Sequence, residues 1–373
     1  MKIGVDARPL SRPLTGIGRY TLEMCKSLSK IDNISLYLYS PSPIDFENLE
    51  NITYIKYRTK NWHNGFLKQL WAEFFLPKWA KEDKIDVFWG PVHRLPRFLP
   101  KTIASVITIH DLVWKYAGDT MHSFTYFLEK FQMPSAIKAA DFIVTDSQST
   151  FDAVKLEFGV ESKRLALIPL AAVFIQNNIS FEELKKYNIN LSYFLFVGTL
   201  EPRKNLARLL EAYSLLPKKL KLQTMLVIVG GKGWGNVDLE NIIAQLNLGD
   251  YVKVLGYVDE QSLTALYAHA KFLAMPSIYE GFGLPLLEAM TQGTPVLTSN
   301  NSSMPEVAGN AGLLIAAQDV NSIKEGLFQL LSNDELLASF ALNTKTQARK
   351  FNWDKSAVQL FNVFNKAINL HRS

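Results

Sequence analysis

Two glutamates, Glu280 and Glu288, stand eight positions apart in the segment YEGFGLPLLEAM (279–290). Between them lie a glycine-rich turn and Pro285, a residue that suits the first position of a helix. The pattern predicts a loop that carries Glu280, followed by a helix with Glu288 in its first turn. Both acids would then flank free N–H groups where the phosphate of a sugar nucleotide can bind. A simpler interpretation is that Glu288 only offsets the helix dipole and Glu280 only faces water.

A pair of adjacent cations, Arg203 and Lys204, lies in GTLEPRKN (198–205), directly after the apolar run YFLFV. A helix is expected to begin near Asn205, so both cations oppose the positive end of its dipole, at about 0.3 kcal/mol or more each. A bound diphosphate would reverse this cost, because Arg and Lys pair strongly with phosphate. We therefore favour a phosphate site over a solvated pair of cations.

Two further turns carry unusual residues. In RPLTGIGRYT (12–21), Gly16 and Gly18 would let the backbone approach a ligand before a helix that starts at about Arg19. The third glycine of a dinucleotide fingerprint is missing, so a flexible turn is the alternative. His110 closes the strand-like run ITIH and could touch a sugar hydroxyl or phosphate. A structural role is the more common one for a lone histidine.

These turns must be positioned by regular elements, and apolar runs that read as strands alternate with helical periodicity along the whole chain. In the segment 204–216, for example, Leu206, Leu209, Leu210 and Tyr213 fall on one helical face. Such alternation predicts parallel sheets with helices on both faces. Ligands bind beyond the carboxyl ends of the strands in such sheets, which is where the four turns are expected.

The length of 373 residues suggests two domains. A polar and weakly periodic stretch at 171–190 is expected to separate them. The first domain would span 1–172 and would be joined by a closing amphipathic helix at 353–373. The second would span 173–352.

The formal net charge of +5 suits phosphorylated small molecules, anionic lipid or nucleic acid. Nucleic acid is disfavoured because the chain has no compact Lys/Arg cluster. One cysteine cannot form an internal disulfide, and no signal peptide or apolar run of about 20 residues is visible. We expect a cytoplasmic protein, soluble or peripheral on the inner face of a membrane.

An aromatic and basic segment at 65–84 leaves two interpretations open. Trp71, Phe74, Phe75 and Trp79, interspersed with lysines, could meet an anionic membrane. An ordinary core helix is the interpretation that we favour, because aromatic stripes usually pack inside.

Taken in order, the motifs resemble those of the retaining sugar-nucleotide glycosyltransferases of family four. The most specific element is the pair of glutamates separated by seven residues with GFGLP between them. The resemblance extends over TGIGRY, HDL, GTLEPRKNLARLLEAY and the late FNWDKSA. It implies an α/β fold of the GT-B type, in which two Rossmann-like parallel-sheet domains hold the active site in the cleft between them.

The resemblance also implies roles for individual residues. Glu280 would contact hydroxyl groups of the donor sugar, and Glu288 would bind the ribose. Arg203 and Lys204 would neutralise the diphosphate, and His110 would lie beside the transferred sugar. Backbone groups of the following residues would complete the donor site: Gly16, Gly18, Gly281, Phe282, Gly283 and Leu284.

A closer resemblance to bacterial mannosyltransferases of O-antigen or capsule synthesis makes GDP-mannose the first candidate donor. The expected hexosyltransferase would move mannose to a hydroxyl of a glycan or lipid-linked saccharide. No D-x-D motif occurs, so neither a catalytic metal nor a separate cofactor is implied. A UDP- or ADP-sugar donor is the alternative. A nucleotide-sugar epimerase and a non-catalytic sugar-nucleotide-binding partner remain as other classes.

Overall fold

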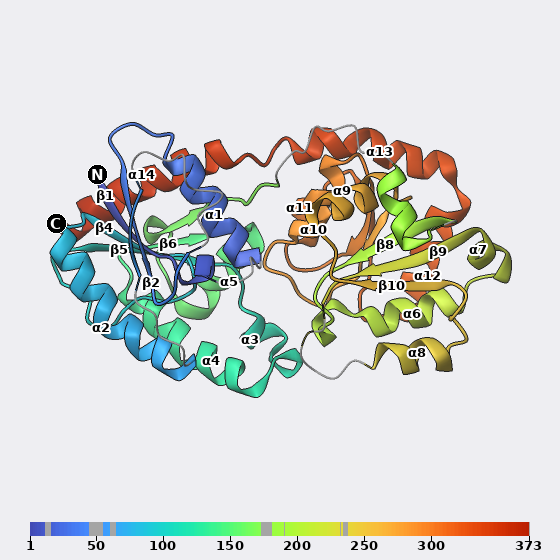
Figure 1. Ribbon diagram of the computed structural model, residues 1–373, viewed down its shortest axis with the longest axis horizontal. Coiled ribbons are helices and arrows are strands. Elements are labelled where there is room, and N and C mark those ends of the chain that lie inside the picture. The colour runs from blue at the N-terminus through green and yellow to red at the C-terminus, as the bar shows by residue number, and fades with distance from the viewer. Residues whose placement is uncertain are drawn as a thin grey trace. The chain divides into compact units, whose positions relative to one another are not determined.

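The chain forms two compact units, each built around one parallel sheet (Figure 1). The computed structural model describes residues 1–11, 16–44, 55–59, 65–172, 181–189, 191–231, 233 and 238–372, with side chains left out at 55–57, 59 and 65–70. Unit 1 comprises Met1–Leu112, Phe127–Leu170 and Asn352–Ser373, and unit 2 comprises Val113–Tyr126 and Ala171–Phe351. Residues 113–126, which we placed in the first domain, thus group with unit 2.

The sheet of unit 1 has the strand order β3-β2-β1-β4-β5-β6-β7, with every neighbouring pair parallel. Its strands are β1 (Lys2–Asp6), β2 (Ser35–Ser40), β3 (Ile55–Thr59), β4 (Val87–Gly90), β5 (Ala104–Ile109), β6 (Phe142–Thr145) and β7 (Leu165–Leu167). The helices of this unit are η1 (Arg8–Ser11), α1 (Gly16–Leu28), α2 (Gly65–Asp83), α4 (Ser123–Ala139, which begins in unit 2), α5 (Gln148–Phe158), η3 (Ser162–Arg164) and α14 (Trp353–Arg372).

The sheet of unit 2 has the order β10-β9-β8-β11-β12-β13 and is also parallel. Its strands are β8 (Ser192–Val197), β9 (Thr224–Val229), β10 (Val252–Gly256), β11 (Leu273–Met275), β12 (Val296–Ser299) and β13 (Gly312–Ile315). The helices are α3 (Val113–Tyr116), η2 (Gly118–Thr120), η4 (Phe181–Tyr187), η5 (Pro202–Lys204), α6 (Leu206–Ser214), α7 (Lys218–Gln223), α8 (Leu239–Gln245), α9 (Glu260–His269), α10 (Leu284–Thr291), α11 (Met304–Ala308), α12 (Val320–Ser332) and α13 (Asp334–Ala348).

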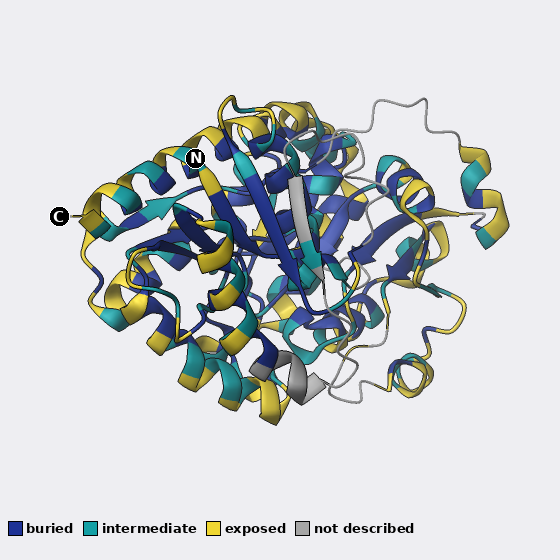
Figure 2. Cartoon of the chain, turned by 60° about the vertical axis from the view of Figure 1, so that its left-hand side comes forward, coloured by how far each residue is buried: buried dark blue, intermediate teal, exposed yellow. Residues whose placement is uncertain are grey.

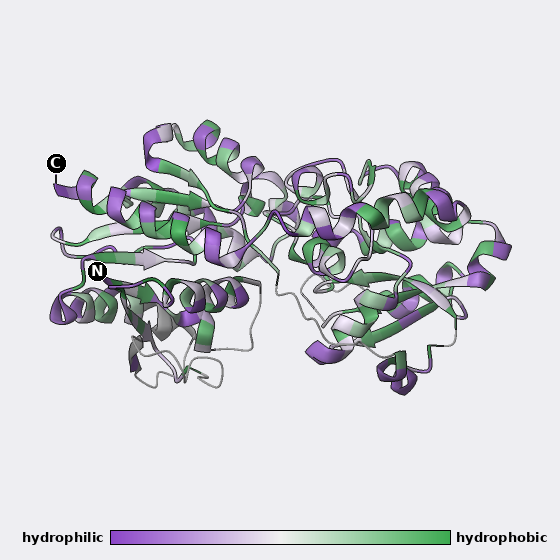
Figure 3. Ribbon diagram, turned by 90° about the horizontal axis from the view of Figure 1, so that it is seen from above, coloured by the Kyte–Doolittle hydropathy of each residue, from purple (hydrophilic) through white to green (hydrophobic). Residues whose placement is uncertain are grey.

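The central strands are buried on both faces, which explains their almost unbroken apolar sequences (Figure 2). Several of the helices that cover them are amphipathic, among them α1, α6, α12 and α14, and hydrophobic and hydrophilic residues alternate along their ribbons (Figure 3). In α6 the four residues predicted to share a face, Leu206, Leu209, Leu210 and Tyr213, are all buried in the core of unit 2. The predicted α/β class with parallel sheets is therefore confirmed.

The aromatic segment at 65–84 forms α2 (65–83), and three of its aromatic side chains lie in or against the core. Trp71 is fully buried, and Phe75 and Trp79 pack against it in an aromatic cluster. This confirms the interpretation as a core helix for these three residues. Phe74 differs, because it is 61% exposed and stacks on the exposed Phe98. No helix within the described ranges is long and apolar enough to span a membrane.

The strand order explains how distant turns meet. In unit 2 the adjacent strands β8 and β11 stand where the chain order along the sheet changes direction. Arg203 and Lys204 follow β8, and Glu280 follows β11. In open α/β sheets such a switch point is the usual ligand site. The sheet thus brings together residues that are 76 positions apart in the chain.

Candidate active site

A buried ion cluster forms at the carboxyl ends of β8 and β11. The Glu280 carboxylate contacts two cations at once, with its Oε1 2.7 Å from Lys204 Nζ and its Oε2 2.6 Å from Arg203 Nη1. Glu280 is 7% exposed and Lys204 is 9% exposed. The alternatives of a loop carboxylate in water and a solvated pair of cations are therefore wrong. The predicted position of Asn205 at a helix start is confirmed, since α6 begins at Leu206.

The charges of this cluster stabilise one another. Burial by itself would raise the pKa of Glu280, but Arg203 and Lys204 outweigh it and hold the pKa at about 2. Burial lowers the pKa of Lys204, and Arg203 lowers it further against the attraction of Glu280. Arg203 also donates to the Tyr279 carbonyl at 2.8 Å and lies 3.4 Å from the Glu201 carboxylate. The arrangement holds two cations in fixed positions at the edge where ligands bind.

Polar residues that the sequence analysis missed hold the Glu280 loop in place. The Ser303 hydroxyl donates to the carbonyls of Glu280 and Phe282, at 3.0 Å each. The Glu280 N–H donates to the Ser302 hydroxyl. The signal that could have found them is the polar run SNNSS after the strand-like PVLT.

The glycine-rich turn requires a glycine at position 283. Gly283 takes a φ of 96°, which side chains rarely tolerate, and a Cβ there would lie 2.5 Å from the Met304 side chain. Gly281, Phe282 and Gly283 are buried, and Leu284, the first residue of α10, is half-buried. The predicted use of their N–H groups for a donor stays a prediction.

The prediction for the position of Glu288 was wrong in one respect. Because the chain enters α10 at Leu284, Pro285 is its second residue and Glu288 its fifth, so the first turn holds no acid. Glu288 therefore does not flank the helix start together with Glu280. Its carboxylate accepts a 2.7 Å hydrogen bond from the Tyr267 hydroxyl of α9 instead. This contact favours a positioned side chain over simple dipole compensation.

In unit 1, His110 follows β5 directly, as predicted, and is buried. Its Nδ1 bonds the Asp146 carboxylate, and its Nε2 lies 2.9 Å from the Pro91 carbonyl. Burial alone would lower the pKa of His110, but the Asp146 charge outweighs burial and raises it. Both ring nitrogens thus face acceptors, which favours the doubly protonated ring. The contact of His110 with a sugar stays a prediction.

The glycine turn at the start of α1 also differs from expectation. The helix begins at Gly16 rather than near Arg19, so Gly16 and Gly18 both lie in its first turn. The preceding residues, 12–15, lie outside the described residues. Tyr20 of the same helix places its ring edge-on to His110, with centroids 4.8 Å apart, and shares the Thr108 hydroxyl with Trp89.

Metal ligation has no candidate among the residues that the structure describes. No group of three or more His, Cys, Asp or Glu side chains in those ranges could hold a metal ion.

Two units, each built on one parallel sheet with charged turns at its strand ends, form the GT-B fold. Solved structures of the same fold include sucrose-phosphate synthase from Thermosynechococcus elongatus (TM-score 0.78, 20% identity, 98% of both chains). WaaG, a glycosyltransferase involved in lipopolysaccharide biosynthesis, also matches (TM-score 0.76, 19% identity, 98% of this chain and 99% of that one). So does Anabaena Alr3699/HepE in complex with UDP-glucose (TM-score 0.76, 19% identity, 98% of this chain and 99% of that one).

Sequence comparisons identify the family. Residues 14–171 match the family described as Glycosyltransferase Family 4, and residues 180–347 match Glycosyl transferases group 1. The chain is 32% identical to the O-antigen chain mannosyltransferase B of Escherichia coli, over 98% of this chain and 99% of that protein. It is 27% identical to the O-antigen chain mannosyltransferase RfbU of Salmonella typhimurium, over 66% and 65%. The chain belongs to glycosyltransferase family 4 and is a glycosyltransferase.

Proposed function

We propose that this glycosyltransferase moves mannose from GDP-mannose to a hydroxyl group of a glycan or lipid-linked saccharide. The reaction would retain the anomeric configuration and serve the synthesis of cell-surface polysaccharide. The similarity to O-antigen mannosyltransferases over nearly the whole chain supports the sugar and the pathway. The observation that carries the chemistry is the buried cluster of Glu280 with Arg203 and Lys204.

In the proposed reaction the barrier is the departure of the nucleoside diphosphate. Arg203 and Lys204 would stabilise the negative charge that grows on the diphosphate. Because Glu280 already fixes both cations, little reorganisation would be needed at the moment of reaction, which is the source of large electrostatic rate effects. Glu280 would contact the donor sugar while the acceptor hydroxyl attacks from the face that the diphosphate leaves, and the leaving phosphate would take the acceptor proton.

The first expected result concerns the donor. GDP-mannose should raise the melting temperature more than UDP-glucose, UDP-N-acetylglucosamine or ADP-glucose. A ligand at a hundredfold excess over its Kd stabilises the fold by about 2.7 kcal/mol, which a thermal-shift assay detects readily. GDP and mannose measured separately show which half of the donor contributes. A larger shift with UDP-glucose, the ligand in the complex of Anabaena Alr3699/HepE, would replace the donor and leave the transferase proposal intact.

The second expected result concerns metal. Transfer should survive excess EDTA, because two fixed cations can neutralise the diphosphate without a divalent ion. Product formation is measured with and without the chelator. Loss of activity that Mg²⁺ or Mn²⁺ restores would contradict this.

Epimerase and non-catalytic alternatives make different products. An epimerase would convert the donor into another nucleotide sugar, and a binding partner would leave it unchanged. Release of GDP with transfer or hydrolysis of the sugar would be expected only of a transferase. The charged cluster favours this outcome, because a scaffold needs no pair of cations such as Arg203 and Lys204 around a buried carboxylate.

We also propose that the enzyme works in the cytoplasm and contacts the inner face of the membrane peripherally. A lipid-linked acceptor would require such contact. The net charge of +5 suits an anionic surface, and Phe74 and Phe98 of unit 1 offer exposed aromatic rings. Co-sedimentation with anionic vesicles is the direct test, with neutral vesicles as the control.

A further inference from the structure

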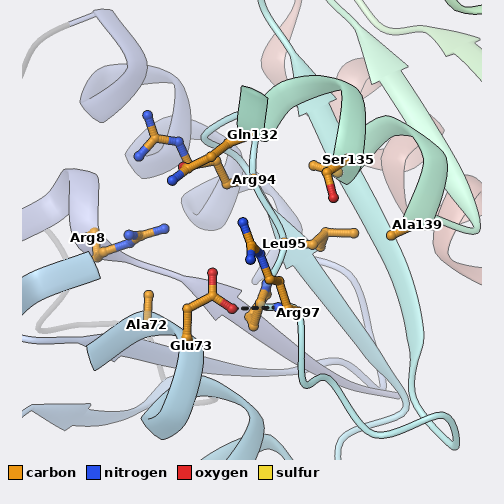
Figure 4. A pocket seen from close by; sticks show the side chains of 11 residues that line it. Arg8, Ala72, Glu73, Arg94, Leu95, Arg97, Gln132, Ser135 and Ala139 are labelled. Carbon is orange, nitrogen blue, oxygen red and sulfur yellow. Dashed lines mark hydrogen bonds between the residues drawn. The ribbon is translucent and has the colours of Figure 1, made fainter. Parts of the chain in front are cut away.

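A charged cavity lies in unit 1, and all of the residues that line it belong to that unit. Its volume is ≈ 190 Å³, and it lies among α2, α4, the start of η1 and the loop that follows β4 (Figure 4). Three arginines line it, namely Arg8, Arg94 and Arg97, together with the carboxylate-bearing Glu73. Arg8 follows β1 and Arg94 follows β4, so the cavity lies on the ligand-binding edge of this sheet.

Two of the arginines, Arg8 and Arg94, form ion pairs with carboxylates that do not line the cavity. The Asp6 carboxylate accepts from Nε of Arg8 at 2.8 Å, and the Glu129 carboxylate accepts from Nη2 of Arg94 at 2.9 Å. Burial alone would lower the pKa of Arg8, but Asp6 and then Glu73 outweigh it and raise the pKa. These ion pairs keep the guanidinium groups charged and fixed in place.

Part of the donor capacity of these arginines is not used by the described residues. Nε of Arg94 is buried and has no hydrogen-bond partner among the described residues. Arg97 forms no ion pair in the described part of the chain. Glu73 accepts the backbone N–H of Arg97, at 2.7 Å. Three arginines and one carboxylate line the cavity, and Figure 4 shows these four side chains around the same hollow, while Asp6 and Glu129 pair with two of the arginines from outside the lining.

We propose that this cavity binds a phosphoryl group. The planar fork of arginine matches phosphate oxygens with paired hydrogen bonds, and several arginines are typical of phosphate recognition. At ≈ 190 Å³ the space is smaller than pockets that enclose a drug-sized ligand, so it suits one small charged group and not a whole nucleotide. Glu73 would accept a hydrogen bond from a neighbouring hydroxyl of the same ligand.

The phosphoryl group could come from a lipid or from a free phosphorylated metabolite. A lipid is the source that we favour, because Phe74 and Phe98, the sequence neighbours of the lining residues Glu73 and Arg97, stack on each other and are more than half exposed. On α4, Phe131 is 69% exposed next to the cavity-lining Gln132. Apolar rings beside a phosphate site suit a ligand with an acyl or prenyl chain. A lipid-linked acceptor as the source rests on the proposed function, whereas the phosphoryl site itself does not.

The site also touches the surroundings of His110. Glu129, the partner of Arg94, lies 3.5 Å from Nδ1 of His93, and Nε2 of His93 accepts the backbone N–H of His110 at 2.9 Å. A ligand that shifts the Arg94 guanidinium would therefore also affect Glu129 and His93. His93 contacts His110, which is predicted to lie beside the transferred sugar.

The test compares binding of inorganic phosphate to the full-length protein and to matched variants. Calorimetry is carried out at constant ionic strength with saturating GDP, so that phosphate cannot occupy the donor site. Arg97→Gln should weaken phosphate binding about tenfold, the factor expected for loss of one charged hydrogen bond. Arg349→Gln removes the same charge from an exposed position of unit 2 and should bind phosphate as the wild type does. Glu73→Gln should bind more tightly, because it removes the one negative charge of the lining.

A second experiment tests whether the phosphoryl group belongs to a lipid or to a soluble metabolite. Vesicles of phosphatidylcholine with phosphatidic acid are compared with vesicles that carry phosphatidylserine instead. Binding that prefers phosphatidic acid and depends on Arg97 supports the site with a lipid source. Phosphate binding that depends on Arg97, without vesicle preference, supports it with a soluble source. Equal behaviour of Arg97→Gln and wild type, or no binding in either arm, overturns the proposal. The GDP-induced thermal shift, recorded on the same samples, reports donor binding separately.

Discussion

Glu280→Ala is expected to lower kcat by about tenfold to a hundredfold, the range for loss of one charged hydrogen bond that strengthens in the transition state. The carboxylate would act on the donor sugar as its anomeric carbon gains positive character. Glu280→Gln should recover only part of the rate, because the negative charge itself contributes. Initial rates at saturating donor and acceptor measure the effect.

The same substitution should also destabilise the protein without donor. Glu280 is buried and neutralises Arg203 and Lys204, so its removal leaves one buried and one partly buried cation with less compensation. Breaking such a cluster costs about 3 kcal/mol or more. A lower melting temperature therefore does not by itself indicate a purely structural role. The kinetics must be measured well below the unfolding transition of each variant.

The contribution of the Glu280 cluster to the free energy of unfolding should depend on pH. The pKa of Glu280 is about 2 in the folded protein, against an ordinary value of 4.5. A lowered pKa means that the stabilisation is complete above pH 4.5 and is lost as the pH falls toward 2. Linkage places this contribution on the order of 3 kcal/mol. Urea unfolding as a function of pH should show the loss in the wild type, and Glu280→Gln should lack that part of the dependence.

Glu288→Ala is expected to change the kinetics differently from Glu280→Ala. Glu288 is expected to bind the ribose equally in the ground and transition states, so Glu288→Ala should raise the donor KM and leave kcat nearly unchanged. Tyr267→Phe is the matched control, because it removes only the 2.7 Å hydrogen bond to Glu288 and not the carboxylate. Identical changes in kcat and KM for Glu280→Ala and Glu288→Ala would refute the assignment of different roles, even with transferase activity established.

Arg203→Ala and Lys204→Ala should each reduce kcat/KM by about tenfold or more, equivalent to about 1.5–3 kcal/mol for a charged hydrogen bond. Each variant removes one of the two cations that would face the leaving diphosphate. GDP affinity should fall in parallel, because the diphosphate remains on the nucleotide. Competition by GDP in the transfer assay measures both quantities.

Arg203 and Lys204 differ in burial, so their alanine variants are expected to differ in stability and need a control for loss of charge. Lys204 is almost fully buried, so Lys204→Ala should also lower stability by leaving Glu280 with Arg203 alone. Lys218→Ala removes an exposed lysine of unit 2 and should leave kinetics and stability near those of the wild type. Near-wild-type kinetics for both Arg203→Ala and Lys204→Ala would show that neither contacts the diphosphate.

The sequence by itself determined the fold class and the turns that carry chemistry. Strand-like runs and helical periodicity are local patterns, and they place His110 after a strand and Arg203 and Glu280 beyond strand ends. Parallel sheets follow from alternation alone, and ligand sites follow from parallel sheets. The buried character of Trp71 and its neighbours on α2 was also predictable, because aromatic stripes usually pack inside.

Local patterns did not determine helix starts to the residue. Gly16, rather than Arg19, opens α1, and the turn at Gly283 shifts Glu288 out of the first turn of α10. Where a helix begins depends on backbone angles such as the φ of 96° at Gly283. Those angles are set by surrounding packing, here by Met304, and not by residue type alone.

Only the tertiary structure decided which charges meet. Glu280 joins Lys204 across 76 positions because β8 and β11 are neighbours in the sheet, an order that no local pattern contains. The arginine cavity arises in the same way, since Arg8 follows β1 whereas Arg94 and Arg97 follow β4. Strand order depends on the free energy of packing the whole sheet. The partner of each charge, and with it the pKa and the chemistry, therefore becomes fixed only when the chain folds.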